Sequence, residues 1–200
     1  DVFLAQTWQL YAEPAIFALE KIYTIAPSFR AEKSKTSRHL TEYWHAEMEM
    51  AWSTFEDIQR HGEGALKHIV KRVLESNPEE LKILERDVSK LEPTLHQPFV
   101  RMTYTQALDI LKKKCKMDVE WGKDLRTVEE EKLTELYDVP IIVTHYPKKV
   151  KAFYMMEDPK NPDVVQGCDF LAPEKNGEII GGSQREHNLE EIKKRLREQG

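Results

Sequence analysis

The chain has 200 residues, 40% of them hydrophobic and 32% charged, with a formal net charge of −5. That length suits one domain with a substantial core, and the slightly acidic balance argues against non-specific nucleic-acid binding by the bulk surface. The two cysteines, Cys115 and Cys168, share no short spacing, so neither a disulfide framework nor a zinc ribbon is expected. The sequence contains no long apolar run and no basic-plus-apolar leader, which indicates a reducing cytoplasm.

The first fifty residues alternate apolar with small or polar positions, which predicts β-strands. One short helical stretch is expected near residues 15–19. From Ser53 onward the apolar residues recur at helical spacing, so a long helix is expected to start there, with Ser53 or Thr54 as its cap. Asn77–Pro78 should end this helix, because proline cannot continue the hydrogen-bond ladder.

Helical character continues after this break. Apolar residues on one face predict a second helix that stops before Pro93, and Thr105 is expected to cap a third helix over residues 106–114. A polar stretch through residues 129–131 predicts a fourth helix. Strands return after Pro140, in the segments "IIVTHYP", "KAFYMM", "VVQGCDFLAP" and, beyond the turn "EKNG", "EIIGGSQRE".

The chain closes with a predicted helix. Asn188, with Glu191 three residues later, forms a capping box for an amphipathic helix to Gln199. Strands, a helical middle and strands again predict an α+β fold, an antiparallel β-sheet with flanking helices.

Two neighbouring strands near the N-terminus each have a polar face, because alternate residues of a strand share a face. In the first strand this face consists of Thr24, Ala26, Ser28, Arg30 and Glu32. In the second it consists of Tyr43, His45, Glu47 and Glu49. If the strands pair, both polar faces fall on one side. A half-solvated sheet would have the same pattern, but the small residues beside Arg30 favour a ligand platform.

The loop between these strands, "KSKTSRH", has no glycine, so it is not a backbone cradle for phosphate. Arg38 and His39 can bind phosphate with their side chains instead. A plain solvated basic loop is the alternative. The segment "HAEME" places a histidine and two glutamates on one face, which also allows a metal site, although no second histidine is well placed.

The C-terminal hairpin carries a second group of polar residues. Asp169 lies in an apolar strand and Glu178 begins the returning strand. Two carboxylates on paired strands suit Mg²⁺, which takes one or two carboxylates together with substrate phosphates. Gly181–Gly182 would let a ligand approach the backbone, and Arg185 follows. Surface charge is the alternative interpretation of this pair.

Five motifs together resemble one known family. The segment "FRAEKSKTSRHLTEYWHAEMEM" is similar over its whole length to the second signature motif of class II aminoacyl-tRNA synthetases. Four shorter motifs occur in the family's order: "QLYAE", "VRMTY", "YPKKVKAFYM" and "GEIIGGSQRE". The resemblance is to the aspartyl/asparaginyl subgroup, most of all to archaeal-type asparaginyl-tRNA synthetases. It covers nearly the whole chain and implies the antiparallel catalytic core of that class.

The family condenses an amino acid with ATP to an aminoacyl-adenylate, releases pyrophosphate and then esterifies tRNA. The resemblance implies that Arg30 is the catalytic residue, bridging the substrate carboxylate and the α-phosphate in a step that needs positioning and charge neutralisation. It implies that Glu32 binds the adenine amino group, and that Arg38 and His39 bind the outer phosphates. The other ATP contacts implied on the hairpin are Ala31 and Leu40.

The resemblance also assigns the remaining site residues. Asp169 and Glu178 match positions that hold Mg²⁺ against the phosphates, which makes Glu178 an ATP-binding residue as well. Gln9 matches the residue that receives the α-amino group of the amino acid. Gly181 and Arg185 belong to the amino-acid site, where Arg185 can donate to an amide oxygen.

Three positions favour asparagine over aspartate. Aspartyl relatives place a lysine where this chain has Ala12, so the cation that would neutralise an aspartate side chain is missing. Glu47 is expected to face the substrate side chain, where it would accept a hydrogen bond from an amide and repel a carboxylate. A buried like-charge contact costs several kcal/mol. With Arg185 as donor, the site is expected to select asparagine.

The resemblance leaves three family parts unmatched: the N-terminal OB-fold that reads the anticodon, the first motif with its dimer helix, and the third motif with its phosphate-binding arginine. Residues 1–200 are therefore interpreted as a piece of a longer protein, a partial catalytic domain. It holds the second motif at 29–50, a helical stretch at 53–92 without an assigned role, and the C-terminal strands with the metal hairpin at 139–186. Full aminoacylation by this piece alone is not expected, and the full-length enzyme is expected to be a homodimer.

Other functions share much of this pattern. An aspartyl-tRNA synthetase, including one that accepts both tRNAs, would conflict with Ala12 and Glu47. An asparagine synthetase descended from the same core would also have to bind an acidic side chain. A non-catalytic module that binds an amino acid or adenylate would not need the intact motif residues. The sequence therefore predicts an asparagine–tRNA ligase that uses ATP and Mg²⁺, with L-asparagine and tRNA(Asn) as partners.

Overall fold

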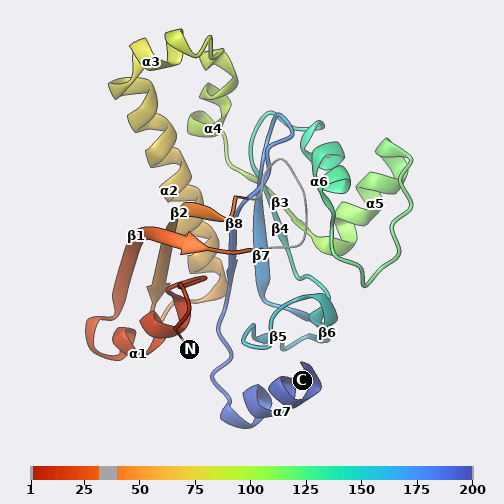
Figure 1. Cartoon of the computed structure of the whole chain (residues 1–200). Helices are drawn as coiled ribbons and strands as arrows, with labels where there is room; N and C mark the ends of the chain where they lie inside the picture. The colour runs from red at the N-terminus through yellow and green to blue at the C-terminus, as the bar shows by residue number, and fades with distance from the viewer. Residues whose placement is uncertain (1, 32–39, 200) are drawn as a thin grey trace. The chain divides into compact units, whose positions relative to one another are not determined.

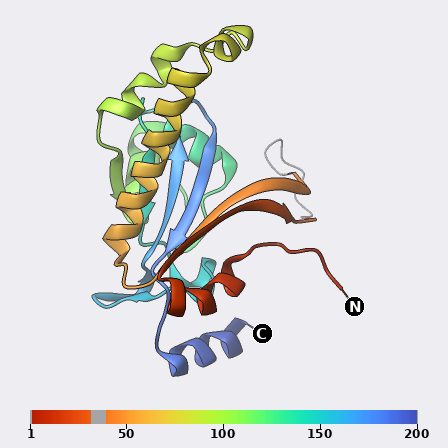
Figure 2. The ribbon, with the colours of Figure 1, turned by 90° about the vertical axis from the view of Figure 1, so that its left-hand side faces the viewer.

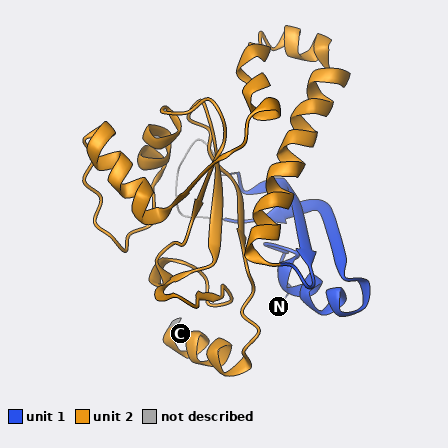
Figure 3. Cartoon of the chain, turned by 180° about the vertical axis from the view of Figure 1, so that it is seen from behind, with its two compact units in different colours: residues 1–53 blue, residues 54–200 orange. Residues whose placement is uncertain are grey.

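The computed structural model describes residues 2–31 and 40–199, and the chain divides into two compact units, residues 1–53 and residues 54–200 (Figure 3). Figure 1 gives the order of helices and strands. Among the described residues, no helix is both long and apolar enough to cross a membrane.

The first unit consists of a helix and a long hairpin. Its elements are α1 (Gln9–Leu19), β1 (Lys21–Phe29) and β2 (Glu42–Met50), and α1 lies against the hairpin (Figure 2). The expected strand before residue 15 is wrong, since helix α1 already starts at Gln9 and contains Pro14. Helix α1 is apolar on nearly every side, so it lacks the one-sided pattern by which a surface helix is recognised in a sequence.

Strands β1 and β2 pair antiparallel, with Thr24 opposite Glu47 and Ala26 opposite His45. Residues directly opposite each other in such a pair point to the same face. The prediction that the two polar faces fall on one side of the hairpin is therefore confirmed. The other face carries exposed apolar side chains, namely Tyr23, Ile25, Trp44 and Met48.

The second unit starts with a helical arm. Its elements are α2 (Phe55–Ser76), α3 (Pro78–Ile83), the 3₁₀ turn η1 (Val88–Lys90) and α4 (Glu92–His96). Thr54 caps α2 in a capping box with Asp57, as one of the two expected caps. The prediction of one helix up to Pro93 is wrong. The backbone turns to a positive φ of 52° at Glu85, and Pro93 lies in the first turn of α4, where a proline is tolerated.

A four-stranded sheet forms the centre of this unit. Its strands are β3 (Val100–Thr103), β4 (Ile141–Thr144), β7 (Gly167–Ala172) and β8 (Gly177–Ser183), side by side in that order. Strands β4, β7 and β8 are antiparallel as expected, but β3 runs parallel to β4. The connection between β3 and β4 contains two helices, and such a crossover returns the chain in the same direction.

These two helices and the remaining elements complete the unit. They are α5 (Tyr104–Cys115), α6 (Thr127–Thr134), η2 (Lys148–Val150), β5 (Glu157–Asp158), β6 (Asn161–Val165) and α7 (Leu189–Gln199). The cap of α5 is Thr103 with Gln106, not Thr105. The segment "KAFYMM" was expected to be a strand but consists of turns and an isolated bridge at Met155. Asn188 accepts from the backbone N–H groups of the first turn of α7, as the predicted cap requires.

Helix α2 packs closely against one face of the sheet, alongside β7 and β8 (Figure 2). An added Cβ at Gly62 would lie 2.5 Å from Cζ of Phe170 in β7, so only glycine allows this approach. A second core lies on the opposite side of the sheet, under α5. Its fully buried members include Tyr104, Leu111, Leu133, Ile141, Val143, Tyr146 and Leu171.

Candidate functional site

The polar face of the hairpin in the first unit is organised around Glu47. One carboxylate oxygen of Glu47 accepts a hydrogen bond from the hydroxyl of Thr7, and the other accepts from the backbone N–H of Trp8 at 3.0 Å. Bonds to both oxygens fix the orientation of the carboxylate. A carboxylate has about four acceptor positions, so Glu47 can also accept a hydrogen bond from a ligand.

The same segment also contacts Arg30 and Gln9. Nε of Arg30 donates to the backbone oxygen of Gln6 at 3.1 Å, and the guanidinium lies 5.6 Å from the ring centre of Tyr43. The backbone N–H of Gln9 donates to Thr7 Oγ1 at 3.1 Å. The structure therefore brings three of the predicted site residues, Gln9, Arg30 and Glu47, to one segment at residues 6–9.

His45 lies between these groups. Its Nδ1 is 3.1 Å from Ser28 Oγ and 3.4 Å from Glu47 Oε2. Burial and the nearby Arg30 lower the pKa of His45, although Glu47 acts in the opposite direction. The alternative of a metal site on this strand gains no support: across residues 2–31 and 40–199, no group of three or more His, Cys, Asp or Glu side chains is arranged to hold a metal ion.

The nucleotide contacts predicted on the hairpin loop are only partly described. Glu32, Arg38 and His39 lie outside the described residues. Ala31 and Leu40, which flank them, are exposed. The predicted phosphate contacts of the loop therefore stay predictions.

The two predicted metal ligands converge in the second unit. Asp169 in β7 pairs with Gly181 in β8, and an added Cβ at Gly181 would lie 2.9 Å from Glu178 Oε1 and 3.7 Å from Asp169 Oδ1. Both carboxylates therefore turn toward the space that the missing side chain of Gly181 leaves open. Part of the Glu178 side chain is in contact with solvent, but burial of its carboxyl and the charge of Asp169 raise its pKa to about 7.

One lysine offsets part of the negative charge of this group. Nζ of Lys151 is 2.7 Å from Asp169 Oδ2 and lies 4.0 Å from the ring centre of Tyr146. Tyr146 is 1% exposed and hydrogen-bonded with Asp169, and burial and that carboxylate raise the pKa of its hydroxyl well above the ordinary value. Burial lowers the pKa of Lys151, but the charges of Asp169 and Asp124 outweigh it, and the net shift is upward. The lysine therefore stays charged.

Arg185 lies two residues beyond the end of β8. Its Nη1 donates to Ser183 Oγ at 2.8 Å, and its guanidinium lies 4.9 Å from the ring centre of Tyr154. These two contacts hold the planar group in a defined orientation, as a donor to a substrate amide would need.

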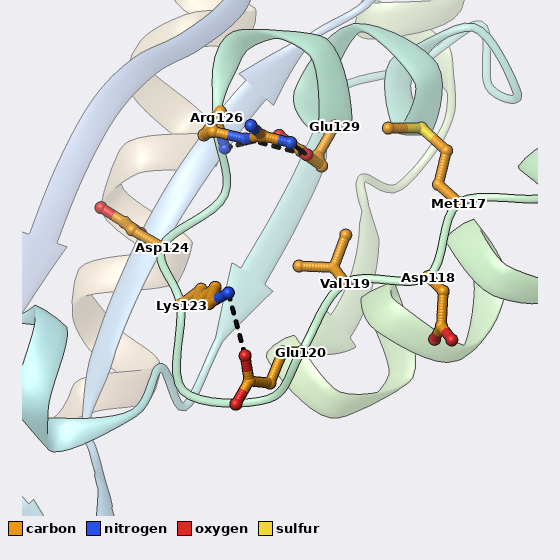
Figure 4. A pocket seen from close by; sticks show the side chains of 8 residues that line it. All are labelled: Met117, Asp118, Val119, Glu120, Lys123, Asp124, Arg126 and Glu129. Carbon is orange, nitrogen blue, oxygen red and sulfur yellow. Dashed lines mark hydrogen bonds and ion pairs between the residues drawn. The ribbon is translucent and has the colours of Figure 1, made fainter.

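A hollow of about 320 Å³ lies next to the loop between α5 and α6 (Figure 4). Its lining consists of Met117, Asp118, Val119, Glu120, Lys123, Asp124, Arg126 and Glu129. Two ion pairs, Lys123 with Glu120 and Arg126 with Glu129, tie most of its charges to one another. None of the residues predicted from the motifs lines this hollow.

Sequence reasoning missed four residues of these two groups: Thr7, Tyr146, Lys151 and Asp124. Tyr146 and Lys151 stand inside the quoted motif "YPKKVKAFYM", so the motif contained the signal. Thr7 and Asp124 are in loop segments, where no periodicity indicates which way a side chain points.

Comparisons with known proteins agree with the sequence motifs. A family model described as "tRNA synthetases class II (D, K and N)" matches residues 1–200. An asparagine–tRNA ligase of Pyrococcus furiosus is 49% identical over 198 residues, which are 99% of this chain and 45% of the relative. The chain thus spans less than half the length of this curated relative.

Two solved structures of tRNA synthetases are also similar to this chain. The crystal structure of asparaginyl-tRNA synthetase from Pyrococcus horikoshii complexed with asparaginyl-adenylate matches with a TM-score of 0.94 and 49% identity, over 98% of this chain and 45% of that one. An aspartyl-tRNA synthetase from Entamoeba histolytica matches with a TM-score of 0.85 and 30% identity, over 99% of this chain and 41% of that one.

Proposed function

Because the chain belongs to the class II tRNA synthetases of the aspartate, lysine and asparagine group, we propose that it is part of the catalytic domain of an asparagine–tRNA ligase. The reaction joins L-asparagine to ATP: a carboxylate oxygen of asparagine attacks the α-phosphorus, the new O–P bond forms, and pyrophosphate leaves. The asparaginyl group is then transferred to tRNA(Asn).

The observation that carries this proposal is the environment of Glu47. Its carboxylate is oriented by Thr7 and Trp8 and keeps acceptor positions for the NH₂ group of an asparagine side chain. An aspartate side chain at the same place would bring two carboxylates together. Ala12 is fully buried in α1, so this position supplies no cation that could relieve the repulsion.

The arrangement of Arg30 supports its role in the first step. Two negative groups, the substrate carboxylate and the α-phosphate, have to meet, and a guanidinium can contact both with separate N–H groups. The bond from Nε to Gln6 fixes the guanidinium and leaves its two terminal nitrogens for the reacting groups. Gln9, on the same segment, would receive the α-amino group.

Asp169 and Glu178 fit a magnesium ion. Their carboxylates converge beside Gly181, and burial together with the charge of Asp169 raises the pKa of Glu178. Mg²⁺ bound here would neutralise the phosphates of ATP. Two protein ligands are enough for such an ion, since it usually takes further ligands from phosphate and water.

Further parts of the proposal concern the whole protein. We place the second motif at residues 29–50 and the metal hairpin within residues 139–186, and we assign anticodon recognition and dimer contacts to segments outside this chain. Cys115 and Cys168 are both free thiols, which suits the reducing cytoplasm.

Calorimetric binding of non-hydrolysable adenylate analogues tests the proposal. The asparaginyl analogue should bind this chain more tightly than the aspartyl analogue in the presence of Mg²⁺. Glu47→Gln should reduce that preference at least tenfold, because a neutral amide no longer repels the aspartyl carboxylate. Glu42→Gln, on the opposite face of the same strand, is the matched control and should leave the preference unchanged.

The outcomes separate the candidate functions. A preference for the aspartyl analogue would contradict the asparagine assignment and favour an aspartyl-tRNA synthetase, the function of one structural relative. Binding of the asparaginyl analogue, combined with failure of the full-length protein to exchange pyrophosphate into ATP in the presence of asparagine, would favour a non-catalytic adenylate-binding module. Failure of both analogues to bind would contradict the proposal for this chain.

A further inference from the structure

We propose that Lys151 is an internal counter-ion of the Asp169–Glu178 pair. When a divalent cation binds to this pair, the Lys151 ammonium moves from Asp169 to Asp124. The inference rests on the proposed function, since it takes Asp169 and Glu178 as ligands of that cation. It assigns roles to two residues, Lys151 and Asp124, that the motif comparison left without one.

The ammonium of Lys151 lies inside the group of carboxylates. Its Nζ is 2.7 Å from Asp169 Oδ2, and the Lys151 side chain is only 13% exposed. Burial removes water from an ammonium, so the carboxylate and the face of the Tyr146 ring have to replace its hydration. The charge of Lys151 is therefore directed at Asp169 and not at bulk solvent.

The backbone next to Lys151 is anchored from another element. Arg195 in α7 is 2% exposed and donates to the backbone oxygen of Met155 and, at 3.2 Å, to that of Ala152. These bonds hold the segment that follows Lys151 in place. Any movement of the Lys151 ammonium is therefore a rotation of its four-carbon side chain, which has several rotamers of similar energy.

A cation bound by the carboxylate pair would meet this ammonium directly. Mg²⁺ binds carboxylate oxygens at about 2.1 Å, closer than any ammonium contact. With Lys151 beside one oxygen of Asp169, both positive groups would share one carboxylate and repel each other. Binding of the divalent cation therefore favours the departure of Lys151 from Asp169.

Asp124 offers Lys151 a second carboxylate. Its Oδ1 is 3.9 Å from Lys151 Nζ, and its side chain is 54% exposed. Figure 4 shows the Asp124 side chain pointing away from the other labelled side chains of its loop, and its Oδ1 accepts from the N–H of Leu125 at 3.1 Å. A small rotation of the Lys151 side chain thus exchanges the carboxylate of Asp169 for that of Asp124, and the ammonium keeps a negatively charged partner.

Titration with Mn²⁺, followed by electron paramagnetic resonance of the free ion, tests this exchange on the chain without nucleotide. Lys151→Met should bind Mn²⁺ about tenfold more tightly than the unchanged chain, because the competing charge is gone. Asp124→Asn should bind it about threefold more weakly, because Lys151 loses its alternative partner. Lys149→Met removes the same charge from an exposed position in the same segment and should have no effect.

The double variant, which combines Lys151→Met with Asp124→Asn, gives a more stringent test. If Asp124 acts through Lys151, the double variant should bind Mn²⁺ as tightly as Lys151→Met alone. Unchanged or weaker Mn²⁺ binding by Lys151→Met would overturn the proposal, and so would tighter binding by Asp124→Asn. The Asp124 variant keeps the test valid if loss of the buried lysine prevents folding, because Asp124 is half exposed.

These results are independent of the test of the proposed function. Changes in Mn²⁺ affinity opposite to those expected, together with normal binding of the asparaginyl analogue, would reject only the proposed role of Lys151. The expected Mn²⁺ affinities without analogue binding would support the counter-ion exchange and reject the asparagine–tRNA ligase assignment.

Discussion

The two units balance the charges of their predicted site residues in different ways. In the first unit, Glu47 accepts hydrogen bonds from Thr7 and Trp8, and Arg30 donates to Gln6, so neutral donors and acceptors of one segment orient the charged groups. In the second unit, the carboxylates of Asp169 and Glu178 face each other across Gly181, with Lys151 between Asp169 and Asp124. The first group is preorganised, and the second carries excess negative charge.

This difference indicates what each group is built to bind. A preorganised set of donors and acceptors selects the shape and polarity of an organic ligand at little cost in ordering. A crowded pair of carboxylates selects positive charge, and its repulsion is relieved only when a cation arrives. This contrast is consistent with the proposed roles, in which Glu47 and Arg30 of the hairpin contact the amino acid and the β7–β8 pair binds the ion that accompanies the phosphates.

The largest expected effect is on ligand binding, and it tests the preorganised group of the first unit. Arg30→Lys should weaken binding of the asparaginyl-adenylate analogue about a hundredfold, or about 3 kcal/mol, because a lysine cannot donate to Gln6 and contact two anionic groups with a planar fork. Calorimetry gives the affinity. Arg60→Lys on α2 is the control, and a loss below threefold for Arg30→Lys would show that its fork is not used.

A smaller effect is expected where α7 supports the segment that carries Lys151. Arg195→Met should lower the free energy of unfolding by about 2 kcal/mol, because it removes charged donors from the partly buried carbonyls of Ala152 and Met155. Chemical denaturation followed by circular dichroism measures this change. Arg197→Met, two residues later and exposed, should change stability by less than about 0.5 kcal/mol. Equal effects of the two variants would contradict the anchoring role.

The smallest expected effect is on stability, and its pH dependence tests the repulsion between Asp169 and Glu178. The pKa of Glu178 is about 7 in the folded chain against 4.5 for an ordinary glutamate, so the folded state binds this proton more tightly than the unfolded state. The stabilising contribution of Glu178 to the free energy of unfolding is therefore fully present at low pH and is lost as the pH rises from 4.5 to 7. Glu178→Gln removes the carboxylate charge and should stabilise the chain at pH 8 and have little effect at pH 4.5.

Because Glu178 is partly in contact with solvent, screening limits the gain at pH 8 to about 1 kcal/mol. Calorimetric unfolding at the two pH values measures the difference without added metal. Glu79→Gln, an exposed position in α3, is the control and should show no such pH dependence. A gain that is the same at both pH values would mean that the two carboxylates do not repel each other in the folded chain.

Sequence alone predicted the hairpin and the position of its polar residues well, because a period of two leaves little freedom once the strands pair. It also placed Asp169 and Glu178 on adjacent strands. It failed where local pattern is weak: α1 is apolar on almost all sides, and the direction of β3 depends on a crossover and not on its own residues. The contacts of Thr7 and Lys151 could not be predicted either, since long-range packing brings loop residues to a strand.

The close contact between Gly62 and Phe170 has a consequence for a distant chemical property. Phe170 follows Asp169 directly, and neighbouring residues of a strand point to opposite faces, so α2 presses on β7 from the side away from the carboxylates. The helical stretch, which has no ligand contact assigned to it, thereby sets how far β7 can move. Bulk added at Gly62 would displace Phe170 and with it the neighbouring Asp169, so α2 supports the position of a proposed metal ligand from the opposite face of the sheet.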